Sequence, residues 1–101
     1  MNQLQVRFER ALHSAMPREF ERYANPRLRA VANLCRQFGE WLPGGFTLPG
    51  AALAAAAGVS AATAHKWLGR LIDDRVLVML ERGDPARKKA SRFRYIGPIL
   101  T

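Results

Sequence analysis

The fold of this 101-residue chain is decided by residues 51–77, AALAAAAGVSAATAHKWLGRLIDDRVL. The first seven residues are almost all alanine, the strongest helix former, whose small side chain lets another helix cross close by. Gly58 favours the left-handed conformation that ends a helix, and Ser60 favours the N-cap position of a second helix. The stretch therefore predicts two helices, over 51–57 and 61–74, joined by a three-residue corner.

The second of these helices is predicted to be amphipathic. Apolar side chains recur in it at steps of three and four residues, which places them on one face of a helix. They are Ala64, Trp67, Leu68, Leu71 and Ile72. The opposite face carries small and polar residues such as Lys66. We expect the apolar face to pack on the body of the protein and the polar face to stay open.

This part of the chain resembles the winged helix-turn-helix superfamily of bacterial DNA-binding proteins. The resemblance rests on Gly58-Val59-Ser60, preceded by Leu53-Ala54 and followed by Thr63-Ala64, Leu68 and Leu71. It covers about residues 46–96, half of the chain. It implies a mainly α fold with a small β-hairpin: a three-helix core plus a two- to three-stranded wing, as in regulators of transcription from bacteria, phages and plasmids.

The rest of the chain predicts the other elements of such a domain. Amphipathic spacing indicates helices over 4–15 and 26–41, a helical turn over 18–23, and a core-facing stripe that continues to Leu42. Asn25-Pro26 is a start signal for the longer helix. Residues 46–48, 76–80 and 92–96 are predicted strands, and 81–91 a loop. We assign 1–24 to an N-terminal helical extension, 25–101 to the winged helix-turn-helix domain, and expect Ile99-Leu100 to fold back on the N-terminal helix.

The charge of the chain points to a polyanionic partner. The formal net charge is +8, and six basic residues stand against one acid between Arg82 and Arg94. A basic surplus concentrated on one segment is typical of proteins that bind nucleic acid. The alternative is a solvated basic hairpin with no partner.

The composition excludes several other classes of protein. The single cysteine, Cys35, allows neither an internal disulfide nor a cysteine-based zinc site, and its place on an apolar helical face predicts a buried residue. No apolar run approaches the length of a membrane span, and the N-terminus lacks a signal-peptide pattern. We therefore expect a cytoplasmic protein with no membrane partner.

The resemblance implies that the second helix enters the major groove and that the wing contacts the backbone or the minor groove. Lys66 can donate to guanine, but the first two turns hold no Arg, Asn or Gln for a bidentate base contact, so affinity should depend on phosphates. Thr63 has the alternative of bonding within its own helix, and His65 that of a plain surface residue. The candidate DNA-binding residues are Ser60, Ala61, Ala62, Thr63, His65, Lys66 and Arg70 on the helix, and Arg82, Arg87, Lys88, Lys89, Arg92 and Arg94 on the wing.

These features predict a small regulator of transcription that binds double-stranded DNA in a sequence-specific manner. Because one helix with few base contacts confers little specificity, we expect a homodimer, formed through the 4–15 helix with Phe20 and Tyr23. The alternative is a protein-interaction or replication and partition adaptor of a mobile element, with nonspecific DNA affinity. RNA binding is a weaker hypothesis, because Trp67, Phe93 and Tyr95 should face inward. No residues suggest an enzyme, a cofactor, a metal site or a small-molecule ligand.

Overall fold

The structure, a computed structural model, describes residues 3–100, apart from the side chain of Pro85. It is a mainly helical domain with a small antiparallel sheet, as the sequence predicted. The helices are α1 (Gln3–His13), α2 (Pro26–Trp41), α3 (Gly50–Ala57) and α4 (Ala61–Asp73), with short 3-10 helices η1 (Arg18–Arg22) and η2 (Pro85–Arg87). The strands are β1 (Phe46–Thr47), β2 (Leu77–Glu81) and β3 (Arg92–Tyr95).

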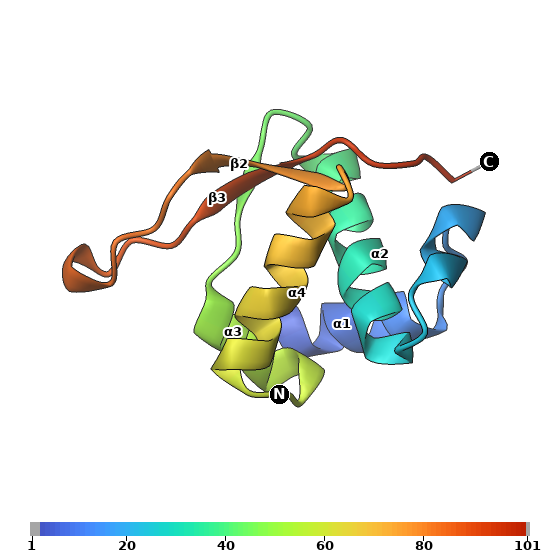
Figure 1. Ribbon diagram of the computed structural model, residues 1–101, viewed down its shortest axis with the longest axis horizontal. Coiled ribbons are helices and arrows are strands. Elements are labelled where there is room, and N and C mark those ends of the chain that lie inside the picture. The colour runs from blue at the N-terminus through green and yellow to red at the C-terminus, as the bar shows by residue number, and fades with distance from the viewer. Residues whose placement is uncertain (1–2, 101) are drawn as a thin grey trace.

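The three strands form one sheet in the order β1-β3-β2, with both pairs antiparallel. Phe46 lies opposite Phe93, and the rings of these two residues and Phe38 make a chain of aromatic contacts that joins the sheet to α2. The register between β2 and β3 shifts at Leu80, which forms a bulge. Figure 1 shows the β2–β3 hairpin reaching away from the helices, with the chain's C-terminal segment running in the opposite direction.

The corner between α3 and α4 forms as the residues predicted. Gly58 has a φ of 69°, the left-handed conformation that glycine adopts without a Cβ penalty. The Ser60 hydroxyl accepts a hydrogen bond of 3.1 Å from the backbone N–H of Thr63, as an N-cap does. An unexpected contact locks the corner to α2: the Arg27 guanidinium donates to the carbonyls of Ala57 and Gly58, each at 3.2 Å.

The apolar face of α4 is buried, as expected. Ala64, Trp67, Leu68 and Leu71 lie in the core, and Ile72 packs against it. Cys35 is also buried, and burial raises the pKa of its thiol to about 12. Asn25 caps α2 by accepting from the Arg27 N–H at 2.9 Å, which confirms the predicted start of that helix.

Several apolar residues of the predicted dimer surface face the interior of the single chain. Helix α1 packs on α2 and α3. Phe8 and Ala11 of α1 are buried there, and so are Phe20 and Tyr23 of the segment that follows. Those side chains complete the same core as α2 and α4, so they offer no apolar patch to a second copy.

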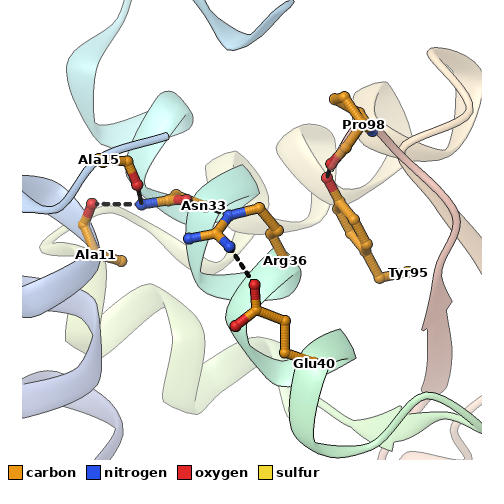
Figure 2. A network of polar contacts seen from close by, with 7 residues as sticks. All are labelled: Ala11, Ala15, Asn33, Arg36, Glu40, Tyr95 and Pro98. Atoms are coloured by element: carbon orange, nitrogen blue, oxygen red, sulfur yellow. Dashed lines mark hydrogen bonds and ion pairs between the residues drawn. The ribbon is translucent and has the colours of Figure 1, made fainter. Parts of the chain in front are cut away.

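A buried polar network joins α1 to α2 (Figure 2). The Asn33 amide donates to the carbonyls of Ala11 at 3.0 Å and Ala15 at 3.3 Å, which satisfies acceptors left open where α1 ends. Its carbonyl oxygen accepts from the buried Arg36 at 2.9 Å, and Arg36 reaches Glu40 at 2.5 Å. This network holds α1 in place through hydrogen bonds that helical periodicity does not reveal.

Three local predictions differ from the structure. Leu42 is 49 % exposed rather than in the core, because the chain leaves the helix there and the stripe ends with it. The segment 81–91 is more ordered than a plain loop: β2 includes Glu81, η2 follows, and Asp84 bridges to Lys89. Ile99 and Leu100 lie beside Met16–Glu21 around an open hollow of about 480 Å³, but both remain exposed.

Of the helices within residues 3–100, none has the length and the apolar run needed to cross a bilayer.

Candidate nucleic-acid interface

The first two turns of α4 present an open surface. Ala61, Ala62, His65 and Lys66 are exposed, while the buried face of the helix points into the core. Neither the His65 imidazole nor the Lys66 ammonium forms an ion pair or hydrogen bond within residues 3–100. Small residues around a free ammonium let a flat or grooved partner approach the helix backbone closely.

The two hydroxyls at the start of α4 are occupied by local bonds. The Ser60 hydroxyl donates to the Thr63 hydroxyl at 3.0 Å while it accepts from the Thr63 N–H. Thr63 is also only partly exposed. The Thr63 hydroxyl is therefore bonded locally, at the start of its own helix, which was the alternative to DNA contact. Both side chains have a structural role in capping the helix.

Arg70 is bound to the protein itself rather than free. Its Nε lies 3.5 Å from the Asp74 carboxylate, and its guanidinium lies over the Tyr23 ring, 5.2 Å from the ring centroid. Asp74 also accepts from the Tyr23 hydroxyl at 2.8 Å and from Arg22 at 3.4 Å. Burial, followed by the bond to the Asp74 carboxylate, raises the pKa of Tyr23 to about 12. This cluster fixes the end of α4 against η1.

Two of the six cations of the hairpin have carboxylate partners. Lys89 donates a hydrogen bond to the Glu81 carboxylate. This hydrogen bond, and then the positive charge of the lysine, lower the pKa of Glu81. Arg87 lies 3.6 Å from the Asp84 carboxylate. Both pairs are open to solvent, where ion pairs are weak and are exchanged readily for other partners.

Of the other four hairpin cations, three have no acidic neighbour in the part of the chain that the structure describes, and Arg92 lies opposite Glu81, whose pKa its charge helps to lower. Arg82, Lys88 and Arg94 are exposed and make no ion pair there. The fourth, Arg92, donates only to the Gly44 carbonyl, at 3.4 Å. The alternation along β3 is as predicted: Arg92 and Arg94 face outward and Phe93 is buried. The outer face of the hairpin is therefore strongly cationic.

An open groove of about 630 Å³ runs between α4 and the start of α2. Leu28 and Trp67 form its apolar wall, and Lys66, Arg70, Asp73 and Asp74 stand at its edges. Gly69 also lines it, and a Cβ built on this glycine would meet nothing within 4 Å. Two acids balance two bases here, so the groove is less cationic than the hairpin.

The sequence did not reveal three features of the structure. It did not indicate the bond from Arg27 to the corner before α4, nor the buried Asn33–Arg36 pair. It also did not indicate that Trp41 would be 60 % exposed. The one available signal was the presence of Asn33 and Arg36 within an apolar helix, since polar residues at such positions are hydrogen-bonded when buried.

Within the described chain no three histidine, cysteine, aspartate or glutamate side chains gather in a way that could hold a metal ion. No protein-family model, curated protein or solved structure matches this chain.

Proposed function

We propose that this protein is a winged helix-turn-helix domain that binds double-stranded DNA. In this proposal α3 and α4 are the helix pair, the first two turns of α4 enter the major groove, and the β2–β3 hairpin is the wing that contacts the phosphate backbone or the minor groove. Lys66 and His65 would meet base edges or phosphates, and the hairpin would supply most of the affinity.

The observation that carries the proposal is the outward face of the hairpin. Arg82, Lys88 and Arg94 are exposed and no carboxylate neutralises them within residues 3–100. The β2–β3 hairpin that carries them reaches away from the helices (Figure 1). Self-repulsion among clustered cations costs stability, and a polyanion relieves it. Phosphates provide such a partner, and the gain is the release of the counterions that surround DNA.

The corner before α4 supports the helix-turn-helix part of the proposal. The left-handed Gly58 and the Ser60 cap set the direction of α4, and Arg27 bonds the corner to α2. The direction of α4 is therefore held by backbone geometry and hydrogen bonds rather than by an open hinge. A helix that is fixed in this way can present the same side chains to every duplex it meets.

The experiment is a titration of a fluorescently labelled duplex of about 25 base pairs, followed by anisotropy at about 50 mM salt. The expected result is binding that weakens steeply as salt rises, together with a subset of sequences enriched by selection from a random pool. Absence of any binding at about 50 mM salt would contradict the proposal, because a basic wing should bind duplex DNA there even without sequence preference. That result would favour the protein-interaction adaptor.

The oligomeric state is tested separately by sedimentation of the free protein and of its complex with DNA. We propose that specific sites are bound by two copies, because α4 offers few base contacts on its own. Since Phe8, Phe20 and Tyr23 of the expected dimer surface are buried, the two copies would meet through another surface or only on DNA. One copy per selected site would refute this part of the proposal and leave DNA binding intact.

A further inference from the structure

Trp41, the last residue of α2, lies in an unusual position. Tryptophan is buried on average more than most residues, yet 60 % of this residue is exposed. It forms one side of an open cavity of about 360 Å³, whose other lining residues are Gln3, Val6, Arg7 and Arg10 of α1. None of these five residues belongs to α4 or to the hairpin, so the cavity is separate from the proposed duplex surface.

Two arginines give the cavity its charge. The Arg7 guanidinium lies over the indole of Trp41, 4.2 Å from the ring centroid, and 5.8 Å from the centroid of Phe38. Arg10 lies one turn further along α1 and is exposed. Within residues 3–100 neither guanidinium makes an ion pair, and no carboxylate lines the cavity. An aromatic ring and two unneutralised guanidinium groups therefore face the same hollow.

The aromatic ring and the two positive charges favour some ligands of this cavity over others. A second copy of the chain, related by a two-fold axis, would bring the same arginines toward each other, and like charges across an interface oppose association. An anionic ligand meets no such opposition. A ligand that also carries a flat aromatic group gains from the indole, because stacking on tryptophan combines with the attraction of guanidinium groups for phosphates.

We infer that this cavity is a binding site for an unpaired nucleotide of a single-stranded nucleic acid. The base stacks on the exposed part of the Trp41 ring, and the flanking phosphates pair with Arg7 and Arg10. The interior of a duplex cannot use such a site, because its base faces are covered by neighbouring base pairs, whereas a single strand can place one base on an aromatic ring. The site thus serves strand ends, gaps or opened segments.

The test uses labelled single strands of ten thymidine or ten uridine nucleotides, followed by anisotropy and by tryptophan fluorescence. The wild-type protein is expected to bind with quenching of its fluorescence, because Trp41 is the exposed tryptophan and Trp67 is buried. Trp41→Ala should weaken binding by about 5- to 100-fold, the range that one base–aromatic stack supplies, and should abolish the quenching. Trp41→Phe should keep most of the affinity. The two strands distinguish DNA from RNA as the source of the nucleotide.

Controls separate this site from general charge and from the wing. Trp41→Ala truncates a side chain that is mostly exposed and leaves the net charge unchanged. The circular dichroism of the variant and its affinity for a blunt duplex should therefore equal those of the wild type. Arg10→Gln should weaken single-strand binding more than Arg18→Gln, which removes the same charge from η1. Equal single-strand affinity of Trp41→Ala and wild type would overturn the inference. So would a dimer that Trp41→Ala converts to a monomer, which would assign the cavity to a second copy. Neither outcome affects duplex binding through the hairpin.

Discussion

Replacing the three unpaired hairpin cations is the sharpest perturbation of the proposed duplex surface. The triple variant Arg82→Gln, Lys88→Gln and Arg94→Gln removes three charges that have no acidic partner within residues 3–100. Their side chains are exposed and none belongs to the buried core, so the fold should stay intact. We expect weaker binding of duplex DNA and, more decisively, a flatter dependence on salt.

The magnitude follows from counterion release. Each phosphate contact contributes about −0.9 to the slope of log affinity against log salt, so six hairpin cations imply a slope of about −5. Raising salt from about 50 to 200 mM should then lower the wild-type affinity about 1000-fold. Three lost contacts should flatten the slope by about 2.7, so the variant should lose only about 25-fold over the same range.

The assay is anisotropy of a labelled duplex at four salt concentrations for three proteins. The charge-matched control is Arg18→Gln, Arg29→Gln and Arg75→Gln, which removes three cations from η1, α2 and the turn after α4 instead. The control should keep a slope close to that of the wild type, because its charges lie outside the proposed surface. Equal slopes for the hairpin variant and the control would refute the reasoning, since binding would then follow net charge rather than the hairpin.

Three further predictions concern the fold. Gly69→Ala should raise the free energy of unfolding by about 0.5–1 kcal/mol in urea denaturation, because alanine favours a helix and its Cβ would meet nothing within 4 Å; a loss of stability would show that the space is filled. Asn33→Ala should cost on the order of 3 kcal/mol, since it breaks two bonds to α1 and leaves the buried Nε of Arg36 without an acceptor, while Glu40 remains a partner of the same guanidinium. A cost below about 1 kcal/mol would contradict the role of the network. Stability should fall as pH rises from 10 toward 12, because the raised pKa of Tyr23 makes the folded state hold a proton that the unfolded state releases, and Tyr23→Phe, compared in the same unfolding assay, should show a smaller fall.

The sequence predicted the helices and strands because their signals are local. The Asn25 cap, the left-handed Gly58, the Ser60 cap and the steps of three and four along residues 61–74 act within a few residues of each other. Such signals depend on backbone propensity and on one amphipathic face, so they can be interpreted without knowledge of the partner that covers that face. The cationic character of the hairpin is likewise a property of composition.

Which side chains are free to act depended on side-chain contacts, some between near and some between distant residues, that periodicity does not show. Arg70 was expected at the DNA surface but is held by Asp74 and Tyr23, which stands 51 residues from that aspartate. Arg87 and Lys89 were grouped with the other hairpin cations, although both form ion pairs with carboxylates. Periodicity does not distinguish a free cation from a paired one, because the distinction lies in side chains brought together by folding.

The amino-acid sequence by itself thus determined the elements, their order and the basic hairpin, because these follow from propensity, periodicity and charge over short stretches. Only the tertiary structure decided that α1 with Phe20 and Tyr23 completes the core instead of exposing a surface, and that Trp41 is open beside Arg7. An apolar face must be covered by another part of the chain, but the residues of that face do not specify which part. Long-range packing, in which all the apolar faces of the chain compete for partners, determines it.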